Sequence, residues 1–194
     1  RDLRMSRGLG DVYKRQGLKI QLKHLDPTLK YNREKKSEIK LSLFFKEESE
    51  YYKNRLQKNS IDFTIFLEDD FSISINRGKI VQIIDNLISN SEYWLIKLKG
   101  NDPNCKPSIT IKIESPWIYF YDNGYGISPA IENMLFEPFV TTKPKGEGRG
   151  LGLFIIQQLL DSSKCTIALE PFRNEHGRKY IFAINFSNII NEYK

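Results

Sequence analysis

Two amide side chains lie one helical turn apart on a segment whose apolar residues recur at helical spacing. They are Asn86 and Asn90, within the predicted helix 79–98. An amide oxygen is a hard neutral ligand that suits Mg²⁺, a cation that keeps several waters and takes phosphate oxygens. The alternative is an amphipathic helix whose polar face meets water, and this segment alone slightly favours that alternative.

A carboxylate and two glycines follow the predicted strand 117–121, in the order Asp122, Gly124 and Gly126, with Ile127 next. A carboxylate at the end of a strand can accept a hydrogen bond from an exocyclic amine such as adenine N6. The glycines let the backbone turn sharply and approach a ring closely. A simple turn is the alternative, because a DxGxG pattern alone is weak evidence.

Four glycines at alternate positions run into an apolar segment, the predicted helix 150–160. Backbone N–H groups freed by glycine, together with a helix N-terminus, form a cradle for phosphate anions. Lys143, Lys145 and Arg149 add positive charge around it. A flexible hinge is the alternative, but a hinge is not usually followed at once by an apolar helix, so the cradle is favoured. The glycines are Gly146, Gly148, Gly150 and Gly152.

Helices and strands that could position these residues are readable from hydrophobic periodicity. Helices are expected at 41–56, 79–98 and 150–160, with a short one near 130–135. Strands are expected at 61–67, 72–75, 108–114, 117–121, 166–169 and 180–186. This order predicts an α+β fold, a two-layer α/β sandwich in which helices cover a mixed sheet.

Length, charge and cysteine content exclude several classes of protein. The 194 residues fit one domain with or without an arm, and no apolar run approaches the roughly 20 residues that span a bilayer. Neither the two cysteines nor the two histidines have metal-ligand spacing, so a zinc site is disfavoured and a reducing, cytoplasmic compartment is expected. Residues 1–60 hold 16 basic and 8 acidic residues, whereas the rest hold 14 and 16. Because acids and bases interleave in the basic part without a stacking pattern of aromatics, a solvated arm is favoured over nucleic-acid binding.

Three parts are expected along the chain. Residues 1–16 show little periodicity and are treated as a candidate non-native leader. Residues 17–58 are expected to form a helical arm, a candidate remnant of a dimerisation region. Residues 59–194 are expected to hold the sheet and its helices, with a lid at 128–149.

In their order and spacing, these motifs resemble those of the GHKL ATP-binding superfamily, which groups gyrase, heat-shock chaperones, histidine kinases and MutL. Residues 82–90 resemble the histidine-kinase N box, 122–126 the first glycine box, 136–143 the phenylalanine motif and 148–153 the second glycine box. A chance match of four ordered motifs is on the order of a few per cent. The resemblance implies a Bergerat-type ATP-binding fold.

The resemblance also implies a site for ATP and Mg²⁺, with a role for each matching residue. Asn90 is expected to coordinate Mg²⁺, and Asn86 to support the metal or the phosphates. Asn86 and Lys143 are expected to contact the nucleotide and to act in catalysis. Asp122 is expected to bind the adenine amine, and the two phenylalanines of the third motif to anchor the lid. The further expected nucleotide contacts are Gly124, Gly126, Ile127, Phe139, Thr142, Gly148, Arg149, Gly150, Leu151 and Gly152.

Four positions depart from the family pattern. Arg149 stands where the kinase glycine box often has Thr or Ser. Tyr93 stands where kinases often carry a basic residue, so Lys143 or Arg149 is expected to meet the phosphate charge. Asn86 stands where hydrolytic members place a glutamate, and an amide cannot take a proton from water, which favours phosphoryl transfer over hydrolysis. His24 lacks the acid and proline spacing of an acceptor histidine, so an exposed helix-end histidine is the favoured interpretation.

Several functions stay open from the sequence. The favoured one is a histidine-kinase-like catalytic domain that transfers the γ-phosphoryl group of ATP to a histidine. The alternatives are a switch ATPase, in which ATP drives lid closure and dimerisation, and a nucleotide-binding module without turnover. The kinase hypothesis implies a homodimer through a helical region, a phosphoacceptor region or a response regulator as partner, and a place in the cytoplasmic part of a larger sensor.

Overall fold

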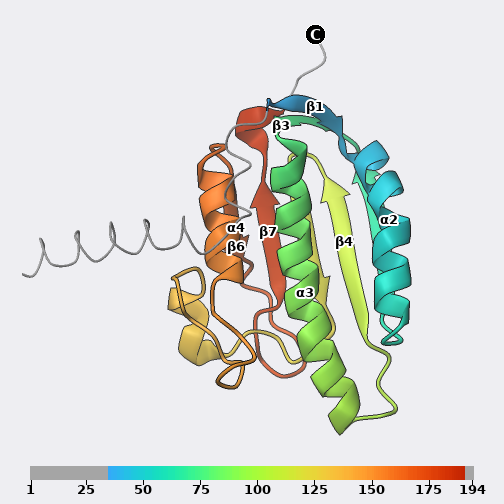
Figure 1. The fold of residues 1–194 in the computed structure, drawn as a ribbon, viewed down its shortest axis with the longest axis vertical. Coiled ribbons are helices and arrows are strands. Elements are labelled where there is room, and N and C mark those ends of the chain that lie inside the picture. Colours follow the sequence, from blue (N-terminus) through green and yellow to red (C-terminus); the bar gives the residue numbers. More distant parts are fainter. Residues whose placement is uncertain (1–34, 191–194) are drawn as a thin grey trace, which may run out of the picture. The chain divides into compact units, whose positions relative to one another are not determined.

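Three α-helices lie on one face of a five-stranded mixed sheet in the computed structural model, which describes residues 35–190 (Figure 1). The strand order is β2-β4-β5-β7-β6. Strands β2 and β4 pair in parallel, and the other neighbours pair antiparallel. The predicted α+β sandwich is confirmed. The strands are β2 (Asp62–Asp69), β4 (Ser108–Glu114), β5 (Trp117–Asp122), β6 (Thr166–Leu169) and β7 (Ile181–Asn185).

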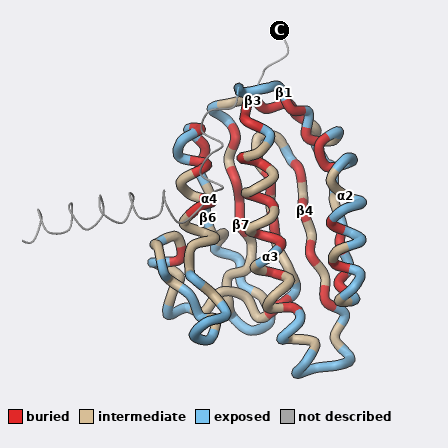
Figure 2. The backbone as a smooth tube through the Cα atoms, viewed as in Figure 1, coloured by how far each residue is buried: buried red, intermediate tan, exposed pale blue. Residues whose placement is uncertain are grey.

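The central helix α3 (Arg77–Asn101) begins where the side chain of Asn76 accepts a hydrogen bond from the backbone N–H of Lys79, at 3.2 Å. Its apolar residues recur every three or four positions, so one stripe is buried against the sheet (Figure 2). That stripe consists of Ile80, Ile83, Ile84, Leu87, Ile88 and Leu95. The alternating isoleucines of β4 face it and are fully buried: Ile109, Ile111 and Ile113. The polar arc of α3 is therefore left free of the core.

Helix α4 (Gly152–Asp161) packs beside α3 and over β6. It buries Ile155, Ile156, Leu159 and Leu160, which hold its first turn next to the polar arc of α3. The long connection from β5 to α4 contains a 3₁₀ helix, η2 (Pro129–Met134), close to the predicted short helix. A second 3₁₀ helix, η3 (Ser187–Ile189), follows β7.

Helix α2 (Leu41–Gln57) belongs to the same core as the sheet. It packs on β2 and buries Leu41, Phe44, Phe45, Tyr52 and Leu56. The strand before it, β1 (Ser37–Lys40), pairs antiparallel with β3 (Ser72–Ile75) and was not predicted. The compact unit begins at Lys36, so the structural boundary differs from the one predicted before residue 59. A role of this segment in dimerisation stays a prediction, and the proposed leader 1–16 and His24 lie outside the described residues.

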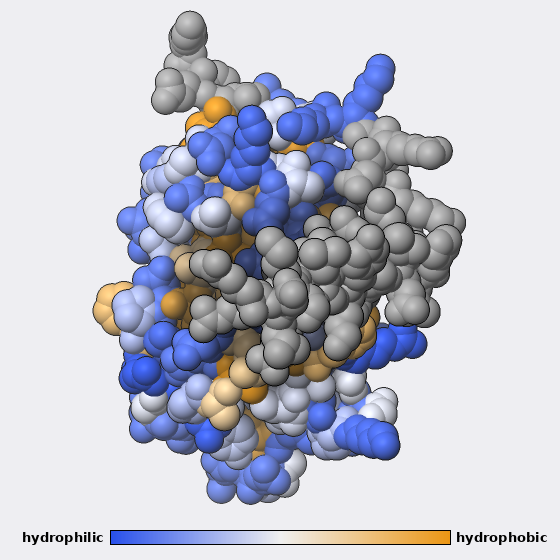
Figure 3. Space-filling model, turned by 90° about the vertical axis from the view of Figure 1, so that its left-hand side faces the viewer, coloured by the Kyte–Doolittle hydropathy of each residue, from blue (hydrophilic) through white to orange (hydrophobic). Residues whose placement is uncertain are grey.

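The surface around α4 and the lid, shown in Figure 3, is mainly hydrophilic outside the grey atoms, with small scattered hydrophobic areas. Of the helices in the described range 35–190, none combines the length and apolar character needed to cross a bilayer.

Candidate functional site

The amides of Asn86 and Asn90 meet the first residue of α4. A Cβ atom added to Gly152 would lie 3.4 Å from Asn86 Oδ1 and 3.4 Å from Asn90 Nδ2. The amide of Asn86 is oriented because its Nδ2 donates to the carbonyl oxygen of Gln82, at 2.9 Å. The start of a helix and two amide groups thus share one small region, where a side chain at residue 152 would contact both amides. This arrangement suits a phosphate group together with its cation.

A lysine from the lid already places a positive charge at the predicted metal ligand. Lys143 Nζ donates to Asn90 Oδ1 at 3.3 Å, and burial of the ammonium lowers the pKa of Lys143. Because the amide oxygen of Asn90 accepts from a cation here, its orientation fits a bound Mg²⁺. Arg149, the other predicted cation, is exposed and forms no ion pair with any residue between 35 and 190. The structure therefore brings Lys143, and not Arg149, to α3.

The two ends of the loop 139–150 are joined at its base. The backbone N–H of Phe139 donates to the carbonyl oxygen of Gly150 at 2.8 Å. Gly150 has a φ of +65°, and a Cβ there would lie 2.4 Å from the carbonyl carbon of Phe139. Only glycine fits this close approach without moving the backbone. A Cβ at Gly148 would likewise lie 2.9 Å from Lys143 Cδ, so this glycine gives the lysine stem its path.

The phenylalanines of the lid act in different ways. The ring of Phe136 packs edge-on against Phe182 of β7, with ring centroids 6.5 Å apart. The ring of Phe139 is 54% exposed, and the backbone N–H of this residue closes the base of the loop. Both residues were predicted to anchor the lid; Phe136 contacts the core through its ring, whereas Phe139 forms a backbone hydrogen bond within the loop.

The carboxylate of Asp122 is held at the end of β5 by two donors. Its Oδ2 accepts from the hydroxyl of Ser91 on α3, and its Oδ1 accepts from the backbone N–H of Gly124 at 2.8 Å. Burial raises the pKa of Asp122, and the two hydrogen bonds oppose that rise. Both oxygens keep lone pairs beyond these bonds, so the carboxylate can accept a further donor such as an adenine amine.

The glycine loop after β5 is supported by the connection between β6 and β7. Asn174 Nδ2 donates to the carbonyl oxygen of Gly124 at 3.1 Å, and the backbone N–H of Ile127 donates to the carbonyl oxygen of Lys179 at 2.8 Å. Gly126 has a φ of +76°, and a Cβ there would lie 3.0 Å from that same carbonyl oxygen. The predicted adenine loop is therefore clamped in place on a second segment.

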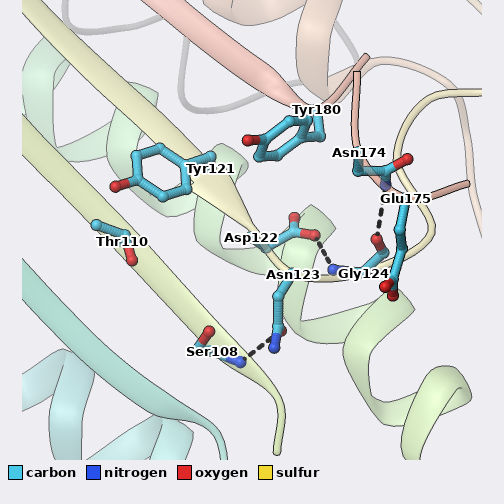
Figure 4. Close-up of a pocket in the computed structure, with 9 residues that line it drawn as sticks. All are labelled: Ser108, Thr110, Tyr121, Asp122, Asn123, Gly124, Asn174, Glu175 and Tyr180. Atoms are coloured by element: carbon cyan, nitrogen blue, oxygen red, sulfur yellow. Dashed lines mark hydrogen bonds between the residues drawn. The ribbon is translucent and has the colours of Figure 1, made fainter. Parts of the chain in front are cut away.

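A cavity of about 340 Å³ opens beside this loop, on the sheet face that the helices leave uncovered (Figure 4). Thr110 and Tyr121 line it, and they alternate along their strands with residues buried under α3. Of the predicted site residues, Asp122 and Gly124 reach it, whereas Asn90 and Lys143 do not. This cavity is therefore separate from the region where α3 meets the lid. Its remaining walls are Ser108, Asn123, Asn174, Glu175 and Tyr180.

The two acidic residues of α3 point to α2 and not to the amides. Asp85 is hydrogen-bonded to Tyr52, and burial raises its pKa. Glu92 accepts from Arg55 Nη2 at 2.6 Å. Both carboxylates thus contact residues of α2 and help to hold α2 against α3. Neither is placed to remove a proton from a water molecule near Asn86.

Some expected contacts reach the site less directly, and some contacts were missed. Thr142 is exposed, and Leu151 is half-buried as the residue that precedes α4. Ser91 and Asn174, which hold the carboxylate and the glycine loop, were not predicted. The adjacency of Ser91 to Asn90 was the one available signal, since the segment around Asn174 has no periodicity.

Comparison with known proteins adds independent information. A family model described as "Histidine kinase-, DNA gyrase B-, and HSP90-like ATPase" matches residues 75–188, more than half of the chain. The sensor protein kinase PilS of Pseudomonas aeruginosa is 26% identical over 192 residues, covering 96% of this chain and 34% of that protein. The two-component sensor PprA of the same species is 34% identical over 88 residues, covering 42% of this chain and 9% of that protein. The chain thus spans about a third or less of these relatives.

Solved structures show the same architecture. The nucleotide-free catalytic domain of histidine kinase ThkA is 25% identical, with a TM-score of 0.60, and the match covers 79% of this chain and 97% of that one. Full-length ShkA, solved in complex with AMPPNP, is 18% identical, with a TM-score of 0.62, and the match covers 82% of this chain and 32% of that one. The second likeness bears on the fold alone.

Proposed function

The chain belongs to the family of histidine kinase-, DNA gyrase B- and HSP90-like ATPases, and from this premise we propose that it binds ATP with Mg²⁺ and serves a protein that phosphorylates a histidine. The family membership and the ATP-binding fold agree with the resemblance read from the motifs. The metal, the individual contacts and the acceptor are parts of the proposal.

One observation supports the proposal above the others. The amides of Asn86 and Asn90, the N-terminus of α4 at Gly152 and the ammonium of Lys143 meet in one place, although they come from three separate segments. In the proposed complex Asn90 Oδ1 would be a ligand of Mg²⁺, which would neutralise charge on the phosphate oxygens. The first backbone N–H groups of α4 would hold the phosphates, and Lys143, beside Asn90, would meet the charge of the γ-phosphate.

The chemistry required of the chain is mainly positioning. Asp122 fixes the adenine end through its free lone pairs, while α4 and Lys143 hold the other end of the nucleotide. An imidazole nitrogen of the acceptor then attacks the γ-phosphorus, the bond to the β–γ bridging oxygen breaks, and ADP leaves. Such phosphoryl transfer depends on alignment and charge stabilisation.

Hydrolysis is disfavoured by what surrounds the amides. Asn86 cannot accept a proton from water, and the carboxylates of Asp85 and Glu92 are bonded to α2. We therefore favour transfer to a histidine over a switch ATPase. The proposed partners are a histidine-bearing region within a homodimer and a response regulator, in the cytoplasmic segment of a larger sensor. The relatives PprA and PilS are named as a two-component sensor and a sensor protein kinase, which supports a place in a sensor.

Labelled ATP tests the proposal directly. The full-length protein is incubated with γ-labelled ATP and Mg²⁺, and the protein-bound label is challenged with acid and with base. Label that acid removes and base leaves indicates phosphohistidine. The matched variant Asn90→Ala should carry no label although it folds. Release of free phosphate without any protein-bound label would contradict phosphoryl transfer, and absence of Mg-ATP binding by calorimetry would contradict the site itself.

A further inference from the structure

One aromatic ring of α3 contacts both ends of the lid segment 143–147. Lys143 Nζ lies 4.3 Å from the centroid of the Tyr93 ring. The hydroxyl of Tyr93 donates to Glu147 Oε2 at 2.5 Å. Lys97, one turn further along α3, lies 3.4 Å from the same carboxylate oxygen. The segment is therefore attached to α3 at two points, and both involve Tyr93.

We propose that Tyr93 is a positioning residue that holds Lys143 beside Asn90, so that a lysine of the lid supplies the positive charge that a basic residue at position 93 would otherwise supply. This inference rests on the proposed function, because it concerns the phosphate end of the same ATP site. It also selects Lys143 over Arg149, which is exposed in the lid.

Helix geometry explains why the ring can act in this way. Asn90 and Tyr93 are three residues apart on α3, so their side chains lie on the same surface of the helix. The face of an aromatic ring attracts a cation, and the attraction grows as water is excluded. Lys143 is half-buried, and its long stem passes Gly148 before its ammonium reaches both Tyr93 and Asn90. Without the ring, this flexible stem would occupy many rotamers.

The second attachment fixes the other side of the loop. The hydrogen bond from Tyr93 lowers the pKa of Glu147, and the same bond raises the pKa of Tyr93 to about 12. At neutral pH the phenol therefore stays a donor and the carboxylate stays an acceptor. Because the ring contacts Lys143 and the hydroxyl contacts Glu147, removal of the whole side chain should weaken both attachments, whereas removal of the hydroxyl alone should weaken one. Asn90 and Lys97 would still contact Lys143 and Glu147, respectively.

The contact between Lys143 and the Tyr93 ring sets the expected loss of Mg-ATP affinity. A cation–π contact of about 0.5–2 kcal/mol corresponds to a factor of about 2 to 30 in affinity. Tyr93→Ala should therefore weaken Mg-ATP binding about 2- to 30-fold, and Tyr93→Phe, which keeps the ring, should weaken it less. AMP lacks the phosphates that Lys143 would meet, so its affinity should not change. A purely structural defect at residue 93 would lower the affinity for both nucleotides.

A double-mutant cycle read by calorimetry tests the proposal. In the Lys143→Ala background, Tyr93→Ala should cause no further loss of Mg-ATP affinity, and Tyr93→Lys should restore part of it. Tyr51→Ala, at an exposed tyrosine of α2, is the matched control and should leave the Mg-ATP affinity unchanged. Thermal melts check that each variant folds.

The outcomes separate this inference from the proposed function. The positioning role of Tyr93 is overturned if Tyr93→Ala binds Mg-ATP as tightly as the wild type does. It is also overturned if the double variant loses the full affinity factors of Tyr93→Ala and Lys143→Ala multiplied together. If the wild-type protein itself binds no Mg-ATP, the proposed function fails. A third outcome is that the losses of Mg-ATP affinity in Tyr93→Ala and Lys143→Ala do not add, but Tyr93→Lys restores no affinity in the Lys143→Ala background. This outcome upholds the positioning of Lys143 by Tyr93. It overturns the idea that a cation at position 93 can replace Lys143.

Discussion

Replacing Asp122 with asparagine should trade nucleotide affinity for stability. The substitution keeps the shape of the side chain and removes its charge. The amide Oδ1 can still accept from the backbone N–H of Gly124, and Nδ2 can donate to the hydroxyl of Ser91 once that hydroxyl turns. The amide, however, offers no ionised acceptor to an adenine amine.

The two expected effects have opposite signs. A hydrogen bond to a charged group contributes about 1.5–3 kcal/mol, so Asp122→Asn should weaken Mg-ATP binding by about 10- to 150-fold. Burial raises the pKa of Asp122, which means that the folded protein holds this proton more tightly than the unfolded chain does. The stabilisation from that proton is present at acidic pH and is lost as the pH rises through the folded pKa. At neutral pH the charge therefore opposes folding, and asparagine should raise the melting temperature.

Calorimetry with Mg-ATP and thermal melts at neutral and acidic pH measure both effects on the same protein. The stability gain of Asp122→Asn should shrink as the pH falls, because the wild-type carboxyl becomes neutral as well. Asp161→Asn makes the same chemical change at an exposed position and should alter neither quantity. An unchanged affinity would refute the adenine contact, and a lower melting temperature at neutral pH would refute the desolvation argument.

Three further changes test other parts of the site. Burial lowers the pKa of Lys143, so its ammonium loses its charge at a lower pH than an ordinary lysine does. As the pH is raised in a series of titrations, Mg-ATP affinity should fall when this charge is lost. Lys143→Arg should remove that fall, because arginine keeps its charge. Gly152→Ala should weaken Mg-ATP binding by about 1–2 kcal/mol, since the added methyl would occupy space beside both amides of α3 that the phosphates would need; equal affinities by calorimetry would argue against phosphate binding there. Glu92→Gln should lower the free energy of unfolding by about 1–2 kcal/mol in chemical denaturation, because Arg55 loses a charged partner, while a loss of Mg-ATP affinity would speak for a role at the site.

The sheet and its helices could be predicted because their residues follow simple periods. The isoleucines of β4 alternate, and the apolar stripe of α3 recurs every three or four residues, so both elements and their buried faces were readable. Strand β1 was not readable, because Ser37–Lys40 has a single buried residue, Ile39, and gains its pairing from β3. Helix α2 was recognised as a helix but assigned to an arm, since periodicity does not reveal which surface a helix packs against.

The site divides in the same way. Side-chain types and their spacing along one element pointed to Asn86, Asn90 and Asp122, and α3 does bring the two amides to one arc. Contacts between distant segments were beyond reach. The bond from Asn174 to Gly124 joins residues 50 positions apart, and no local pattern marks it. The contacts of Tyr93 with Lys143 and Glu147 could not be predicted either, although the sequence showed that Tyr93 departs from the family pattern.

Helix α3 separates the groups that stabilise the fold from those that face the lid. On the side towards α2, its carboxylates Asp85 and Glu92 are bonded to Tyr52 and Arg55. On the side towards α4 and the lid it presents neutral amides, one phenol and the ammonium of Lys97. These groups can bind a cation or a phosphate but cannot serve as a strong base. Among these α3 groups, none activates water. Under the proposed function, the attack on the γ-phosphate is therefore left to a nucleophile outside α3.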